Sequence, residues 1–133
     1  MARRAIRTGA APAPVAGAPY SQAIAVSGGE TVWVAGQVPL LPSGEPAAAD
    51  VAGQTRQCLA NISAILAAAG GSMADVVKTT VYMGDLGAFP EMNAAYAEAF
   101  GEMPPARATI GVVALPAGAL IEIEAVAVIG AAG

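Results

Sequence analysis

Two stretches of the chain carry the hydrophobic spacing of a helix with one buried face. Between residues 51 and 69 apolar side chains recur every three or four positions, which is the repeat of an amphipathic helix. Asp50 precedes this stretch and can cap the helix, and the glycines at 70 and 71 can end it. A second stripe starts near Pro90, which suits a first helical position, and stops before Gly101. The pattern therefore predicts two helices.

The other apolar stretches are short and rich in β-branched residues, as strands are. They are the runs 22–27, 31–38, 76–83, 108–113 and 120–129. Gly28 and Gly29 separate the first two runs, which predicts a hairpin, and a further short strand is expected near residues 4–8. The predicted order is β-β-α-β-α-β-β, in a single α+β domain that covers residues 1–133.

The last predicted strand is largely apolar on both of its faces. Leu120, Glu122, Glu124 and Val126 point to one side, and the residues between them point to the other. Two helices can cover only one face of a sheet, and no residues remain for a second layer. We therefore expect another copy of the chain to cover the open face, as in a homo-oligomer.

Composition disfavours several classes of function. The chain has no His, so it lacks the usual base of Ser and Cys hydrolases and the commonest zinc ligand. Cys58 is the only cysteine, which excludes an intramolecular disulfide and offers no cluster for a metal. Six basic residues against ten acidic ones give a net charge of −4, which disfavours nucleic acid as a partner.

Neither a membrane span nor a signal peptide is expected. Although 56% of the residues are hydrophobic, no stretch of about 18 apolar residues lacks a charge or a Pro or Gly break. The basic residues near the N-terminus are followed by Gly, Ala and Pro instead of the apolar run of a signal peptide. We expect a cytoplasmic protein without a membrane partner.

Arg107 and Glu122 are the main candidates for chemistry, and each has an ordinary structural alternative. Arg107 enters a strand from a loop with two prolines, a rigid place from which a planar guanidinium can bind a carboxylate. It could equally be a solvated or ion-paired arginine. Glu122 could orient a water molecule and accept its proton. With Glu124 it also forms a pair roughly 6.5–7 Å apart, which is near the spacing in inverting glycosidases but also typical of a solvated strand face.

Two further reactive side chains are assigned no catalytic role. Cys58 falls on the apolar stripe of the first helix, where a thiol behaves as a small hydrophobic group. Lys78 is the only lysine and lies in a predicted strand, where a lysine is more often an edge or ion-pair residue than a Schiff base.

Seven segments of the chain, in this order, resemble the reactive intermediate deaminases, the RidA (YjgF) family. The segments are APYSQAI (18–24), VAGQVPL (34–40), GQTRQCLANISAILAAAG (53–70), DVVKTTVYMGDL (75–86), FPEMNAAYAEAF (89–100), PPAR (104–107) and LPAGALIEIEAVAV (115–128). The resemblance implies a chorismate-mutase-like subunit with two helices on one face of a mixed sheet. It also implies a barrel-like homotrimer with active sites between subunits.

The same resemblance implies an activity and a set of site residues. The activity is hydrolysis of 2-enamine and 2-imino acids, of the 2-aminoacrylate and 2-iminopropanoate type, to 2-keto acids and ammonia, without a cofactor or metal. Arg107 would pair with the substrate carboxylate and Glu122 would manage the attacking water. Four more residues are implied to bind substrate: Tyr20 and Asn93 as side chains, and Gly36 and Thr109 through the main chain.

Departures from the family pattern bear on which substrate is used. They are Ala18 where Gly is common, Ala35 in place of Ser before Gly36, Thr109 in place of Cys, and a short loop at 101–106. An alternative from another class is a ligand-binding or regulatory trimer that senses small 2-keto acids without turnover. A ribonuclease, as some relatives are labelled, fits poorly with the acidic balance and the missing His.

Overall fold

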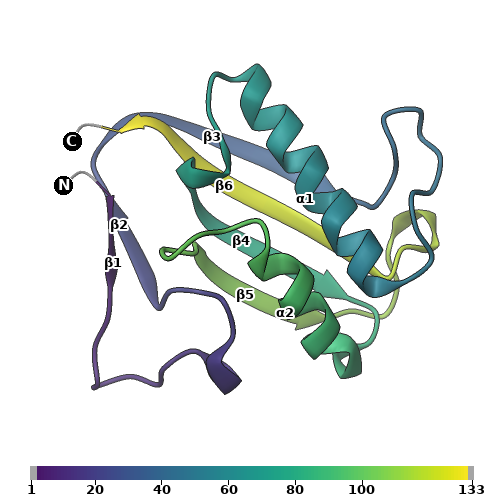
Figure 1. The fold of residues 1–133 in the computed structure, drawn as a ribbon, viewed down its shortest axis with the longest axis horizontal. Helices are drawn as coiled ribbons and strands as arrows, with labels where there is room; N and C mark the ends of the chain where they lie inside the picture. Colours follow the sequence, from purple (N-terminus) through teal and green to yellow (C-terminus); the bar gives the residue numbers. More distant parts are fainter. Residues whose placement is uncertain (1–2, 132–133) are drawn as a thin grey trace.

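The computed structural model describes residues 3–131 as three strands followed by an alternation of helices and strands (Figure 1). The elements are β1 (Arg3–Ile6), β2 (Ala23–Val26), β3 (Gly28–Gln37), α1 (Val51–Ala68), β4 (Val76–Met83), α2 (Phe89–Ala97), β5 (Ala106–Gly111) and β6 (Ile121–Ala131). This is the predicted order, with the short extra strand present at the start. The structure thus confirms the predicted α+β class.

A four-stranded mixed sheet in the order β3-β6-β4-β5 forms the body of the fold. Strands β4 and β5 are parallel, and the other neighbours are antiparallel. Helices α1 and α2 lie on the same face of this sheet (Figure 1), and the core fills the space between the two layers. The largest fully buried side chains include Tyr96, Ile62, Leu66, Met83, Met92, Ile121 and Ile123.

Helix α1 begins and ends where its capping residues place it. The Asp50 carboxylate accepts a hydrogen bond of 3.3 Å from the Gly53 amide, which satisfies a free N–H of the first turn. At the other end Gly70 has a φ of +85°, and the Gly71 amide donates to the Leu66 carbonyl at 2.8 Å, the pattern of a glycine-terminated helix. No helix in the described part of the chain is long and apolar enough to cross a membrane.

Nothing among residues 3–131 forms a layer over the other face of the sheet. Along β6 the residues at 121, 123, 125 and 127 are buried beneath the helices, while Glu122, Glu124 and Val126 face away from them. Trp33, which pairs with Val126 across the strands, is 78% exposed. An apolar, partly exposed face of this kind is the surface that the sequence assigns to another copy of the chain.

The predicted hairpin between residues 22–27 and 31–38 is wrong. Both strands form, but β2 pairs with β1 in a separate two-stranded sheet, and β3 pairs with β6. We call residues 3–26 the N-terminal arm; in Figure 1 it stands beside the main sheet. The physical reason is an anchor at β5: Ser21 forms a parallel bridge with Ala106, and its amide donates to the Pro105 carbonyl at 3.1 Å.

Candidate functional site

The guanidinium of Arg107 lies among three aromatic rings. Its carbon is 4.9 Å from the ring centroid of Tyr96, 5.2 Å from that of Tyr20 and 5.5 Å from that of Phe89. Arg107 pairs with Thr79 of β4, a residue buried beneath the helices, so the Arg107 side chain projects to the helix side of the sheet. At these distances each ring face attracts the cation. The structure therefore contradicts a merely solvated arginine.

Arg107 has no acidic partner among the described residues. The ion pair found within residues 3–131 joins Arg56 to Glu98 at 3.0 Å, on the exposed surface. Burial lowers the pKa of Arg107, and the nearby Tyr96 and Tyr20 oppose that change. Arginine is protonated far above neutral pH, so the side chain stays charged near pH 7. A half-buried cation without a counter-charge suits an anionic ligand.

Buried polar atoms without hydrogen-bond partners gather on the predicted site residues. Among the described residues four such side-chain atoms occur: Arg3 Nε, Asn93 Oδ1, Arg107 Nη2 and Thr109 Oγ1. Buried polar groups are paired in nearly all proteins, so each of these needs a partner. Arg107 Nη2 and Thr109 Oγ1 can both donate to a carboxylate. The Thr109 side chain thus joins the site, in addition to the main-chain role implied by the sequence.

A cavity of about 230 Å³ lies beside Arg107 and Thr109. Its other lining residues are Val15, Tyr20 and Phe89. A cavity of this volume can hold a small organic acid but is too small for a polymer. Asn93 is not one of the lining residues. The Tyr20 hydroxyl accepts a hydrogen bond of 2.8 Å from the Val15 amide, which holds the ring in place at the cavity wall.

Sequence reasoning missed two of the three rings around Arg107, because their pattern is that of a buried helix face. Phe89 and Tyr96 are separated by seven residues on α2, with Met92 and Asn93 between them on the same side. Such a stripe predicts core packing, and Tyr96 is indeed fully buried. Its hydroxyl shares a hydrogen bond of 2.7 Å with Thr79 Oγ1. Burial raises the pKa of Tyr96 to about 12, so the ring facing Arg107 is neutral near pH 7.

The Thr79–Tyr96 hydrogen bond should measurably stabilise the fold. Tyr96→Phe leaves the buried Thr79 hydroxyl without this partner, and we expect a loss of about 1–3 kcal/mol in the free energy of unfolding. Thr79→Val should cost a similar amount. The double variant should cost less than the sum of the two, because neither polar atom remains. Urea unfolding of all four proteins checks this, and strictly additive losses would contradict a coupled pair.

Glu122 lies on the opposite face of the sheet from Arg107. Glu122 pairs with Tyr82 of β4, whereas Arg107 pairs with Thr79 of the same strand. Side chains alternate between the two faces along a strand, so residues three positions apart, such as 79 and 82, point to opposite faces. The Glu122 side chain instead runs over Gly36, which lies in an irregular part of β3 between Val34 and Gln37. One chain therefore brings Arg107, Tyr20 and Thr109 together, and Glu122 and Gly36 together, as two separate groups.

Gly36 should be required for the position of Glu122. A Cβ added at this position would lie 2.9 Å from Cδ of Glu122 and would collide with its Oε2. We expect Gly36→Ala to displace the carboxylate and to lower at least tenfold any turnover that depends on it, with the thermal midpoint changed little. Gly101→Ala, where an added Cβ meets nothing within 4 Å, is the matched control. Equal activities of the two variants would contradict a role for the Gly36–Glu122 contact.

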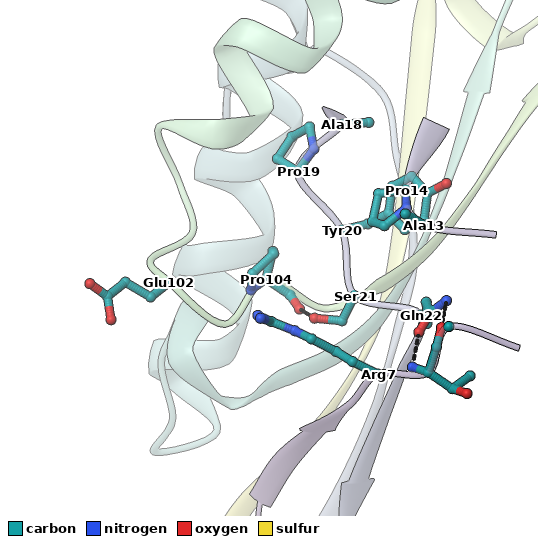
Figure 2. Close-up of a pocket in the computed structure, with 12 residues that line it drawn as sticks. Arg7, Ala13, Pro14, Ala18, Pro19, Tyr20, Ser21, Gln22, Glu102 and Pro104 are labelled. Carbon is teal, nitrogen blue, oxygen red and sulfur yellow. Dashed lines mark hydrogen bonds between the residues drawn. The ribbon is translucent and has the colours of Figure 1, made fainter. Parts of the chain in front are cut away.

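A larger cavity, of about 500 Å³, lies between the N-terminal arm and the loop before β5. Figure 2 shows Arg7 extended toward Pro104 and Glu102 pointing away from the cavity. Gln22 is occupied by the arm itself, since its side chain bonds the main chain at Thr8, Ala11 and Pro12. The cavity contains neither Arg107 nor Glu122, so its polar groups hold the arm together and do not form the predicted site.

The remaining reactive groups have structural roles. Cys58 is fully buried, and burial, with a smaller contribution from Glu122, raises the pKa of its thiol to about 12. Glu124 accepts a hydrogen bond of 2.9 Å from the Tyr82 hydroxyl, which argues against its acting as the second carboxylate of a glycosidase. Within residues 3–131 no group of three metal-binding side chains occurs.

Comparisons with known proteins connect this geometry to a family. Residues 10–129 match a family model described as Endoribonuclease L-PSP. A RutC family protein of Pyrococcus abyssi is 49% identical over 96% of this chain and 98% of that protein. The 2-iminobutanoate/2-iminopropanoate deaminase of Homo sapiens is 43% identical over 98% of this chain and 93% of that enzyme.

Solved structures agree with the sequence matches. The Rid family protein YyfB from Yersinia pestis has 34% identity and a TM-score of 0.88, with 97% of this chain and 100% of that chain covered. The TdcF protein of E. coli, solved with bound serine, has 40% identity and a TM-score of 0.71, with 94% and 98% covered. Both the family model and these structures cover nearly the whole chain. The chain belongs to the Rid (RidA/YjgF) family.

Proposed function

We propose that this protein hydrolyses small 2-imino acids and their 2-enamine tautomers to 2-keto acids and ammonia. One observation carries the proposal: a half-buried Arg107, walled by three aromatic rings, faces a cavity of about 230 Å³ with no acidic partner in the described chain. A planar guanidinium in such a place suits a carboxylate bound through two hydrogen bonds. The small cavity suits a short side chain on the substrate.

The reaction needs little beyond orientation and a proton carrier. Arg107 and the Thr109 hydroxyl hold the carboxylate, which fixes the imine carbon next to it. A water molecule attacks that carbon while Glu122 accepts one of its protons, and transfer of this proton to the nitrogen gives the tetrahedral amino alcohol. Glu122 then takes the hydroxyl proton and delivers it to the same nitrogen while the C–N bond breaks and the C=O bond forms, so that ammonia leaves a 2-keto acid. Water supplies the oxygen, and no oxidant, metal or cofactor is needed.

The site is proposed to form between copies of the chain in a homotrimer. Arg107 and Glu122 lie on opposite faces of one sheet, so they can act on one substrate only if they come from different subunits. The open face with Glu122, Val126 and the exposed Trp33 is the surface available for that contact. Asn93 is proposed to line the same cleft from α2.

Names of relatives support the substrate class. The human relative is named for 2-iminobutanoate and 2-iminopropanoate, which are four- and three-carbon imino acids, and TdcF was solved with serine, a three-carbon amino acid. Each has a carboxylate next to a carbon bearing nitrogen. We also propose that the protein acts in the cytoplasm, on imines released by pyridoxal-phosphate enzymes.

The test is a coupled assay. A dehydratase generates 2-iminobutanoate or 2-iminopropanoate in the cuvette, and the decay of the imine absorbance is compared with and without the purified protein. Faster decay, with one keto acid and one ammonia formed per imine, supports the proposal. Saturable binding of a 2-keto acid with no faster decay would replace it with the sensing role.

A further inference from the structure

The outer edges of β3 and of β2 have no strand partner within the described residues. Strand β3 pairs with β6 along one edge, and no strand lies along the other. Strand β2 pairs with β1 along one edge only. An open edge as long as Gly28–Gln37 exposes a row of N–H and C=O groups that will bind another strand unless it is covered.

These two edges are the ones that the sequence predicts to pair with each other. A Gly-Gly pair between two strand-like runs is typical of a two-residue hairpin turn. In the structure Gly28 and Gly29 keep positive φ values of 71° and 79°, so the connection has the backbone freedom of a hinge. The strands form as predicted, and only their mutual pairing is missing.

The N-terminal arm is anchored too far from its own β3 to pair with it. The Ser21 amide and hydroxyl bond the carbonyls of Pro105 and Pro104, and Arg3 donates to the Val76 carbonyl at 2.8 Å. The Ser21 contacts lie at the β5 edge, and β5 and β3 are the opposite edges of the sheet. With strands spaced by about 4.8 Å, three spacings separate those edges by roughly 14 Å.

We propose that copies of this chain exchange their N-terminal arms, so that β2 of one copy pairs with the open edge of β3 in a neighbour. Domain exchange of this kind makes between copies the same pairing that a closed hairpin would make within one. A second copy of the chain supplies β2, whose four residues can cover part of the ten-residue β3 edge in the antiparallel direction of a hairpin. No other segment among residues 3–131 lies along the β3 edge.

The exchange would also join the two halves of the proposed active site, and this step rests on the proposed function. A two-residue turn at Gly28-Gly29 sets Ser27 opposite Glu30 and, six pairs further, Ser21 opposite Gly36. Ser21 follows Tyr20, which contacts Arg107 of its own chain. In the neighbour, Gly36 lies against Glu122 of that same chain. The arm would thus place Arg107 of one subunit near Glu122 of the next.

Cysteine pairing between different chains tests the exchange. The same register puts Val26 opposite Thr31. In a Cys58→Ala background, a tagged Val26→Cys chain and an untagged Thr31→Cys chain are co-expressed, purified by the tag and mildly oxidised. We expect a disulfide-linked dimer that contains one chain of each kind on a non-reducing gel, with the linkage identified by mass spectrometry.

Matched controls separate exchange from random contact and from loss of fold. A Val26→Cys chain co-expressed with Ala60→Cys, on the exposed side of α1, should give no such dimer. A chain with both Val26→Cys and Thr31→Cys reports closure of the arm on its own β3. Linkage only within that chain, or no linkage in any pair that keeps the wild-type circular dichroism spectrum, would overturn the proposal.

The outcome is independent of the enzymatic proposal. Cross-linking is read on a gel and needs no substrate. A linked dimer in a protein that does not hydrolyse imines would support the exchange of arms and contradict the proposed enzymatic function. Fast imine hydrolysis without a mixed dimer would support the enzymatic function and contradict the exchange of arms.

Discussion

Replacement of Arg107 by Ala should lower kcat/KM for imine hydrolysis by more than a hundredfold. The substrate carboxylate would lose two charge-assisted hydrogen bonds, each of which contributes on the order of 1.5–3 kcal/mol, and a sum of about 3–6 kcal/mol corresponds to roughly 10²–10⁴-fold. None of the neighbouring rings of Tyr20, Phe89 and Tyr96 carries a positive charge, so none of them replaces the guanidinium. The coupled imine assay over a range of substrate concentrations measures the change.

Arg107→Lys sharpens this prediction. A lysine keeps the charge but not the planar fork, and its ammonium cannot make the two parallel hydrogen bonds. We expect its activity to lie between those of the wild type and Arg107→Ala, chiefly through a higher KM.

Arg56→Ala is the matched control for the loss of an arginine. Arg56 is exposed and bonds Glu98 on the surface, so its removal should leave the rate within about twofold. If a folded Arg107→Ala protein hydrolyses imines as fast as the Arg56→Ala protein, Arg107 is not part of the active site and the proposed site is wrong.

The second large effect is expected for Glu122→Gln. The amide has nearly the same size, so it keeps the contact with Gly36, but it cannot accept the proton of the attacking water. General-base catalysis typically contributes about 10²–10⁴-fold, and the loss should appear in kcat with KM little changed. Glu124→Gln is the matched control, since Glu124 is two residues away on the same face and is bonded to Tyr82.

The two catalytic variants can be combined to test whether the site is shared. Co-expressed Arg107→Ala and Glu122→Gln chains form some mixed interfaces in which an intact Arg107 meets an intact Glu122, so part of the activity should return. If both residues acted within one chain, the mixed protein would stay as inactive as its components.

Local patterns predicted the elements of this fold well. Strand β4 has the predicted bounds, Val76–Met83, and α1 starts after its predicted cap at Asp50, because capping and hydrophobic alternation act over a few residues. Strand β5 starts two residues earlier than predicted, at Ala106. Its first residues are apolar or charged instead of β-branched, and its pairing with β4 decides its start.

Pairing over long distances in the sequence was not predictable in the same way. The Gly28-Gly29 signal describes what the turn permits, whereas the position of β2 depends on Ser21 meeting Pro104 and Pro105, more than eighty residues away. The surroundings of Arg107 depend likewise on two separate segments, the N-terminal arm with Tyr20 and α2 with Phe89 and Tyr96. Residue identity marked Arg107 as a candidate, and only tertiary contacts distinguish it from a surface arginine.

Burial of Cys58 has a consequence for how long such a protein would survive the proposed substrate. The carbon of a 2-imino acid is an electrophile, and the thiolate is the nucleophilic form of cysteine. The single thiol of this chain is fully buried and has a pKa near 12, so almost none of it is ionised near pH 7. With no His and one Lys in the chain, the protein has few nucleophilic side chains that could add to such an electrophile.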